Sequence, residues 1–181
     1  MESPADRSRN IFLVGPMGVG KTTIGRLLSQ ELGLEFFDSD QEIEKRAGAD
    51  IAWIFDVEGE EGFRIRESSV LDDLTLRSGV LIATGGGSIL EESNRRMLRS
   101  RGTVVFLDTS LEIQLRRTER DKKRPLLQNV DHEKVLAELK AARDPLYNEV
   151  ADVRVFAGDS GSRKTVSIIL EQLKDHGYIR G

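Results

Sequence analysis

The first residues that suggest chemistry form a glycine-rich loop near the start of the chain. The stretch Gly15-Pro-Met-Gly18-Val19-Gly20-Lys21-Thr22 fits the pattern G-x-x-x-x-G-K-[ST] without a mismatch. In such a loop the glycines let backbone N–H groups approach phosphate oxygens, and the lysine reaches the β- and γ-phosphates. The threonine hydroxyl can ligate Mg²⁺. A plain glycine-rich turn with a solvated lysine is the alternative, and the flanking segments decide between the two.

Those flanking segments are the ones that phosphate binding needs. Ile11–Val14 is a short apolar run, which is typical of a buried parallel strand. After the loop, apolar residues from Ile24 to Leu32 recur at helical spacing, so a helix is predicted to begin near Lys21. The N-terminus of that helix adds partial positive charge beside a bound phosphate. Strand, loop and helix together predict a nucleotide-phosphate site.

Two further motifs follow predicted strands. Asp38-Ser39-Asp40 comes after the apolar run at 35–37, and Gly85-Gly86-Gly87 comes after the run at 80–83. Ligands of open α/β sheets bind beyond the C-terminal ends of the strands, so both motifs and the glycine-rich loop should line one crevice. One carboxylate can hold a metal, while the other accepts a hydrogen bond or proton from an acceptor hydroxyl. Helix capping by Ser39 or Asp40, and a simple tight turn at the glycines, are the structural alternatives.

A second candidate for the metal carboxylate ends another apolar run. Asp108 follows Val104–Leu107, as the aspartate of a Walker B strand does. The pattern alone does not decide between Asp38 and Asp108. Thr109 and Ser110 come next, so a role of Asp108 in helix capping is the alternative.

Arginines supply positive charge suited to anionic ligands. The planar guanidinium can hold a carboxylate or phosphate through two parallel hydrogen bonds. Arg64 lies in an acidic helical stretch, Arg143 lies in AARDPLY, and basic residues accumulate up to Arg124, beside Pro125. A cation that closes over a γ-phosphate stabilises developing charge and excludes water, which makes Arg124 the preferred candidate. Any one arginine is more often solvated or salt-bridged than functional.

The composition places these motifs in a single globular domain. The chain has 181 residues, 38% of them hydrophobic and 32% charged, with a net charge of −4. That charge argues against wholesale nucleic-acid binding, and no apolar run approaches the ~20 residues of a membrane helix. The absence of cysteine excludes disulfides, thiolate metal sites and cysteine nucleophiles, and it fits a cytoplasmic location.

Short apolar runs alternate with amphipathic stretches along the chain, which predicts a parallel sheet covered by helices. The predicted strands are Ile11–Val14, Glu35–Phe37, Val80–Ala83, Thr103–Leu107 and Val153–Phe156. The predicted helices are Thr22–Leu32, Gln41–Ala47, Ile51–Phe55, Gly62–Arg77, Glu91–Arg101, Leu111–Arg120, Glu133–Ala142 and Val166–Lys174. The segment from Arg120 to Asp131 is basic at first, contains a proline and has poor periodicity, so it is a predicted mobile loop.

In order and approximate spacing, the motifs GPMGVGKTT, DSD, GFR, GGG, RPLL and RDPLY resemble those of shikimate kinases, which are small P-loop proteins related to nucleoside monophosphate kinases. The resemblance runs from about Asn10 to Phe156. It implies one α/β domain over residues 1–181, with a three-layer P-loop fold built on a five-stranded parallel sheet flanked by helices. It also implies a helical substrate-binding region at about 39–66 and a mobile lid at about 118–131.

The resemblance also implies an activity: transfer of the ATP γ-phosphate to the 3-hydroxyl of shikimate, in the biosynthesis of chorismate and the aromatic amino acids. The residues that would bind ATP are Gly18, Val19, Gly20, Lys21, Thr22, Thr23, Arg117 and Arg124. Those that would bind shikimate are Asp40, Arg64, Gly85, Gly86, Gly87 and Arg143. Thr22 and Asp38 would hold Mg²⁺, which settles the choice against Asp108 by resemblance. Lys21, Asp40 as proton acceptor and Arg124 as lid cation would be catalytic.

Two other functions remain as alternatives. One is a kinase of the same fold for another small hydroxy acid such as gluconate, and the other is a nucleotide-dependent switch with negligible turnover. The combination of Arg64, Arg143 and Asp40 favours shikimate over both. The expected ligands are ATP and shikimate, with no nucleic acid and no membrane. A monomer is expected because no coiled-coil pattern or apolar surface stripe occurs in the sequence.

Overall fold

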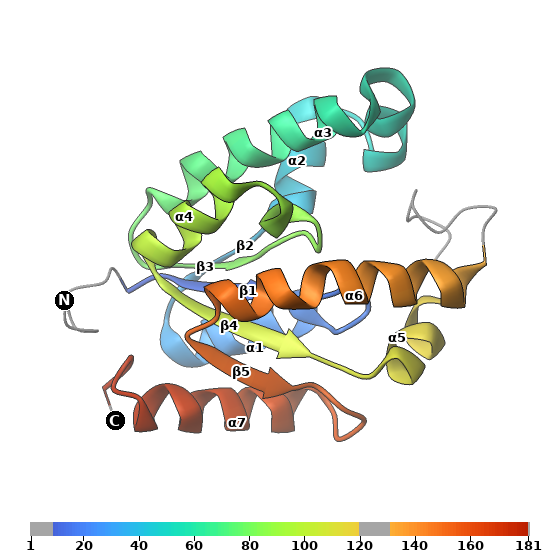
Figure 1. Ribbon diagram of the computed structural model, residues 1–181. Helices are drawn as coiled ribbons and strands as arrows, with labels where there is room; N and C mark the ends of the chain where they lie inside the picture. Colours follow the sequence, from blue (N-terminus) through green and yellow to red (C-terminus); the bar gives the residue numbers. More distant parts are fainter. Residues whose placement is uncertain (1–8, 120–130, 181) are drawn as a thin grey trace.

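The ends of the strands that carry the motifs lie side by side in one parallel sheet. A computed structural model describes residues 9–119 and 131–180 (Figure 1). Its sheet contains β1 (Ile11–Val14), β2 (Glu35–Asp38), β3 (Val80–Ala83), β4 (Thr103–Asp108) and β5 (Val153–Phe156). The strand order is β2-β3-β1-β4-β5, and every adjacent pair is parallel. The strand predictions are confirmed, with β2 and β4 each extending to the aspartate at its end.

Helices cover both faces of this sheet, which makes the three predicted layers. They are α1 (Lys21–Leu32), α2 (Ser39–Ala47), α3 (Ile51–Thr75), the short 3₁₀ helix η2 (Ser88–Leu90), α4 (Glu92–Arg101), α5 (Leu111–Thr118), α6 (His132–Val150) and α7 (Ser162–Asp175). In Figure 1, α1 and α7 lie on one side of the sheet, whereas α3, α4 and α6 lie on the other. Within the described part of the chain, no helix combines the length and apolar content needed to cross a membrane.

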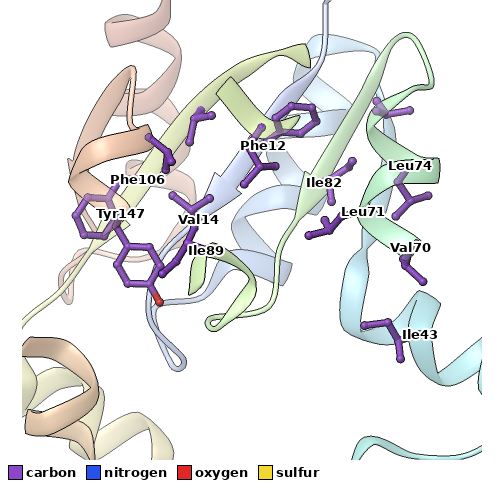
Figure 2. Close-up of a cluster of buried hydrophobic side chains, with 14 of the residues drawn as sticks. Phe12, Val14, Ile43, Val70, Leu71, Leu74, Ile82, Ile89, Phe106 and Tyr147 are labelled. Atoms are coloured by element: carbon purple, nitrogen blue, oxygen red, sulfur yellow. The ribbon is translucent and has the colours of Figure 1, made fainter. Parts of the chain in front are cut away.

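Alternate residues of each central strand enter two separate cores. Phe12 and Val14 of β1 belong to the core beneath α3, α4 and α6, while Ile11 and Leu13 face the core beneath α1 and α7. Because successive side chains of a strand point to opposite faces, a strand covered on both sides must be apolar throughout. This explains the unbroken apolar run at 11–14. Figure 2 shows the first of these cores.

Most helix ends lie within a few residues of the prediction, and two helices differ by more. The stretches predicted at Ile51–Phe55 and Gly62–Arg77 are one element, α3, with a kink where Gly59 adopts φ 72° and ψ 178°. Helix α6 was predicted to end at Ala142 but continues to Val150 with Pro145 inside it. Proline removes one helical hydrogen bond, yet burial of Tyr147 and Val150 in the core stabilises the last turns.

Two aromatic side chains at the start of α3 have different surroundings. Trp53 is 55% exposed. Its neighbour Phe55 does pack, with its ring 4.7 Å from that of Phe63. The predicted lid falls almost wholly in 120–130, outside the described residues, and Arg124 lies there with it.

Candidate active site

The glycine-rich loop joins β1 to α1 in the conformation that phosphate binding requires. Gly18 and Gly20 have φ values of 79° and 95°, in the left-handed region that glycine adopts without strain. A Cβ atom on Gly18 would lie 2.8 Å from Cγ2 of Thr118, so the close approach of α5 also requires glycine. The Lys21 ammonium donates to the carbonyl oxygens of Gly15 and Pro16 at 2.6 and 2.9 Å, and so stays over the loop. The loop is therefore formed and its lysine is in place.

Arg117 ties this loop to the segment after β5. Its guanidinium donates to the Gly18 and Val19 carbonyls at 3.2 and 3.3 Å and to the Gly158 carbonyl at 2.8 Å. This places a planar cation at the end of the phosphate loop, between β5 and α5. That position is consistent with the predicted contact of Arg117 with the nucleotide base.

Thr22 and Asp38 come together as the sequence predicted for a metal site. The Thr22 hydroxyl donates to Oδ2 of Asp38 at 2.5 Å, joining the first turn of α1 to the end of β2. A hydroxyl and a carboxylate are hard oxygen ligands of the kind that Mg²⁺ prefers. Over residues 9–119 and 131–180, no three or more His, Cys, Asp or Glu side chains form a metal-binding group. The pair therefore fits a Mg²⁺ ion that also uses phosphate oxygens and water.

Asp108 has a different role from the one that its position suggested. It accepts from Arg154 at 2.5 Å and from Lys140 at 3.1 Å, so two cations already neutralise it. Burial acts to raise the pKa of Asp108, but the hydrogen bonds from Arg154 and Lys140 outweigh it and the pKa falls below its usual value. Asp108 is also not a helix cap, because Ser110 caps α5. It fastens α6 and β5 to the end of β4.

The acidic motif caps the start of α2. The capping residue lies one position before Ser39, the first of the two residues considered for this role. Asp38 is the cap, and its Oδ1 accepts from the backbone N–H groups of Asp40 and Gln41 at 3.0 and 3.1 Å. Asp38 thus serves as cap and metal candidate through different oxygens. Ser39 is fully buried, and its hydroxyl accepts from the Gly85 N–H at 3.0 Å. The central serine therefore connects the acidic motif to the glycine motif.

The three glycines lie between Asp40 of the acidic motif and the phosphate loop. A Cβ atom on Gly85 would lie 2.6 Å from Oδ1 of Asp40, and one on Gly86 would lie 3.6 Å from the Met17 backbone nitrogen. A side chain at Gly85 would displace the Asp40 carboxylate. The glycines thus do more than make a turn, because they allow the polar side chains of the site to approach bare backbone closely.

Arg64 reaches this loop from α3 with an acidic partner. Its Nη1 lies 2.8 Å from Oε1 of Glu67, three residues along the helix, and its guanidinium lies against Gly87. Glu67 is 1% exposed, and among the described residues its Oε2 has no hydrogen-bond partner. Burial raises the pKa of Glu67 to about 7, opposed by the charge of Arg64 and reinforced by the charge of Asp40.

Arg143 reaches the same loop from α6, on the opposite side. It is 5% exposed, and its Nη1 lies 3.5 Å from where a Cβ on Gly86 would be. One helical turn later, the Tyr147 hydroxyl donates to the Gly86 carbonyl at 2.5 Å. Two arginines therefore converge on the triglycine loop from different helices, with Asp40 beside it.

The predicted site residues that the structure describes lie at the phosphate loop or around the triglycine loop. For Thr23, within the phosphate loop segment, no side-chain contact with the described residues supports a role. Arg124 lies outside the described residues. The reading of the sequence missed three polar side chains that shape the site: Ser39 as a link to the glycines, Glu67 and Tyr147. Glu67 had one signal in the sequence, an acid three positions after Arg64 on a predicted helix, where side chains are neighbours. Tyr147 also had a signal, because it ends the RDPLY motif, but it was given no role and the helix was predicted to end before it, at Ala142.

The arrangement can hold a nucleotide phosphate on one side and a small anionic molecule with hydroxyl groups on the other. The phosphate loop, Lys21 and the Thr22–Asp38 pair serve the first. Arg64 and Arg143 suit a carboxylate, and Asp40 with Glu67 can accept hydrogen bonds from hydroxyls.

Comparison with known proteins agrees with this division. The family model for shikimate kinase matches residues 17–174. The chain is 57% identical to shikimate kinase of Buchnera aphidicola subsp. Acyrthosiphon pisum over 168 residues, which cover 92% of this chain and 97% of that one. It is 56% identical to shikimate kinase of Vibrio cholerae, covering 93% and 97%.

Solved structures give the same picture. Shikimate kinase from Acinetobacter baumannii in complex with shikimate superposes with a TM-score of 0.91 at 50% identity, covering 94% of each chain. Shikimate kinase from Aquifex aeolicus superposes with a TM-score of 0.82 at 38% identity, covering 93% of this chain and 98% of that one. A sugar kinase from Janibacter is 19% identical with a TM-score of 0.60, and this likeness concerns the fold alone.

Proposed function

Because the chain belongs to the shikimate kinase family, we propose that it transfers the γ-phosphate of ATP to the 3-hydroxyl of shikimate, giving 3-phosphoshikimate and ADP. The observation that carries the proposal is the convergence of Arg64 and Arg143 on the triglycine loop beside Asp40, next to a formed phosphate loop. Shikimate has one carboxylate and three hydroxyls, and this set of side chains complements both kinds of group. The gluconate alternative has no such support among the relatives.

On the acceptor side, we assign the carboxylate of shikimate to Arg64 and Arg143, with backbone groups of the triglycine loop beside them. Anchoring the acid fixes which hydroxyl faces the γ-phosphate. Asp40 lies beside Gly85 of the same loop, and we assign it the proton of that hydroxyl as the new O–P bond forms. Glu67 holds Arg64 in its rotamer and presents a second carboxylate oxygen to the same site.

On the nucleotide side, backbone N–H groups of the phosphate loop and Lys21 bind the phosphates, and Arg117 lies beside the base. We assign Mg²⁺ to Thr22 and Asp38; when bound, the ion neutralises charge on the transferring phosphate. The family resemblance supports Arg124 as a cation over the phosphates and residues 118–131 as a lid. We further propose a single domain, acting as a monomer on the ATP of the cytoplasm.

The proposal is tested by ADP release from Mg-ATP by the purified chain, with shikimate, with gluconate and with no acceptor. We expect a large stimulation by shikimate alone. Stimulation by gluconate instead would keep the phosphate site but overturn the assignment of Arg64, Arg143 and Asp40. Slow ADP release that neither acid changes would point to another acceptor or to a nucleotide switch.

A further inference from the structure

The hydroxyl of Tyr147 joins two parts of the acceptor site that come from different elements. It donates to the Gly86 carbonyl at 2.5 Å, and it lies beside the Arg143 guanidinium: a Cβ atom on Gly86 would be 3.5 Å from Nη1 of Arg143 and 3.6 Å from this hydroxyl. Because the phenol proton goes to Gly86, the phenol oxygen faces the guanidinium as an acceptor, and an arginine N–H can only donate. The two residues lie four apart on α6, on one face of the helix. The hydroxyl therefore links this helix to the loop at the point where Arg143 reaches it.

The surroundings of this hydroxyl favour its protonated form. Tyr147 is 1% exposed, and its burial raises its pKa, an effect that the neighbouring Arg143 reduces only in part. The ring itself packs 5.0 Å from that of Phe106, and Figure 2 shows the two side by side in the core. The hydroxyl is thus a fixed donor at the end of a rigid, buried ring.

A loop of three glycines needs such fixed partners, because glycine loses more conformational freedom on folding than any other residue. Each peptide group of this loop has one. The Gly85 N–H donates to Ser39, the Gly85 carbonyl accepts from the Ser88 hydroxyl at 2.7 Å, and the Gly86 carbonyl accepts from Tyr147. Peptide groups are planar, so fixing the Gly86 carbonyl also fixes the direction of the Gly87 N–H. Of these side chains, Tyr147 is the one whose hydroxyl lies with Arg143 at Gly86.

We propose that Tyr147 is a positioning residue for the acceptor: its hydroxyl holds the Arg143 guanidinium and the triglycine backbone in one register, so that both meet the substrate carboxylate together. This inference rests on the proposed function, since it concerns the same acceptor. It makes a specific claim, that the hydroxyl contributes to shikimate binding and leaves the nucleotide side unaffected. The Tyr147 hydroxyl donates to the triglycine loop, whereas the Lys21 ammonium donates to the Gly15 and Pro16 carbonyls of the phosphate loop.

The test compares steady-state kinetics of the full chain, Tyr147→Phe and Tyr178→Phe. The first variant keeps the ring that packs on Phe106, and the second removes the other hydroxyl of the two tyrosines in the chain. One net hydrogen bond predicts that Tyr147→Phe raises the KM for shikimate roughly 3- to 10-fold, with the KM for ATP within about twofold of wild type. Tyr178→Phe should match wild type in both.

Three outcomes would overturn the inference: equal rises in both KM values, an unchanged KM for shikimate, or a loss confined to kcat. A wild-type chain that does not respond to shikimate would overturn the proposed function itself. A responsive wild type with an unchanged Tyr147→Phe variant would overturn only the role of Tyr147. The two failures are therefore distinguishable.

A spectroscopic measurement does not depend on the folding of Tyr147→Phe. The Tyr178→Phe chain has one tyrosine, so labelling with 3-fluorotyrosine gives a single ¹⁹F resonance from position 147. We expect shikimate to shift this resonance in a saturable way, because its carboxylate would join Arg143 and the loop that the hydroxyl contacts. A resonance that shikimate leaves unmoved at saturating concentration would refute the positioning role.

Discussion

Replacing the buried carboxylate of Glu67 should change how the stability of the protein depends on pH. Glu67→Gln keeps the size and shape of the side chain but cannot ionise. In the folded protein, the groups that face Glu67 are Arg64 on its own helix, Asp40 on α2 and Arg143 on α6. Desolvation outweighs the two arginines and raises the pKa of Glu67 to about 7 from its ordinary 4.5.

The sign follows from which state binds the proton. Between pH 4.5 and about 7 the folded wild type keeps the proton on Glu67 while the unfolded chain has lost it, so the free energy of unfolding falls as pH rises. The contribution of Glu67 protonation to the free energy of unfolding is complete below pH 4.5 and is lost once the pH passes the pKa of Glu67 in the folded state. At roughly 1.4 kcal/mol for each pKa unit, the full loss amounts to about 3 kcal/mol.

The assay is urea unfolding of the unliganded protein from pH 4 to pH 8, for wild type and Glu67→Gln. Other carboxylates contribute equally to both proteins, so the difference between their unfolding free energies isolates Glu67. We expect this difference to shift by about 3 kcal/mol in favour of the variant as the pH rises from 4.5 to 8. Glu61→Gln, which removes an exposed carboxylate from the same helix, is the matched control for loss of charge.

A constant offset between wild type and Glu67→Gln over this pH range would refute the reasoning. It would mean that Glu67 has the same pKa in the folded and unfolded states, so that its pair with Arg64 cancels the cost of burial. A shift of the opposite sign would mean a folded pKa below 4.5, with the pair outweighing that cost. Either result would mean that Glu67 is ionised in the acceptor site at neutral pH.

Three further predictions concern turnover. Asp40→Asn should lower kcat by roughly 10²- to 10⁴-fold while sparing ATP binding, measured by calorimetry, because it removes the proton acceptor; undiminished turnover would contradict that role. Arg143→Ala should raise the KM for shikimate by roughly 10- to 100-fold and that for ATP far less, as expected for a lost charge-assisted hydrogen bond; equal losses would count against it. Lys21→Ala should abolish ADP formation with every acceptor, and removal of Mg²⁺ from wild type with EDTA should do the same until Mg²⁺ is restored.

Much of the fold and of the nucleotide side could be read from the sequence because the signals there are local. The phosphate loop, its strand and its helix are contiguous, and the apolar runs at 11–14, 80–83 and 104–107 became strands covered on both faces. That Asp38 and the phosphate loop share one edge of the sheet could be predicted because parallel strands present their ends there, but the choice of Asp38 over Asp108 as partner of Thr22 came from the family resemblance.

The acceptor side depended on residues that are distant in the chain and on burial. Asp108 looks like a metal ligand in sequence, and only its contacts with Lys140 and Arg154 assign it a structural role. Glu67 is one of many acids in its segment, and desolvation alone sets it apart. Tyr147 reaches Gly86 because helix α6 continues through Pro145, a local cost that core packing offsets. Sequence patterns report local geometry, whereas charge state and partners depend on what the tertiary fold packs around each side chain.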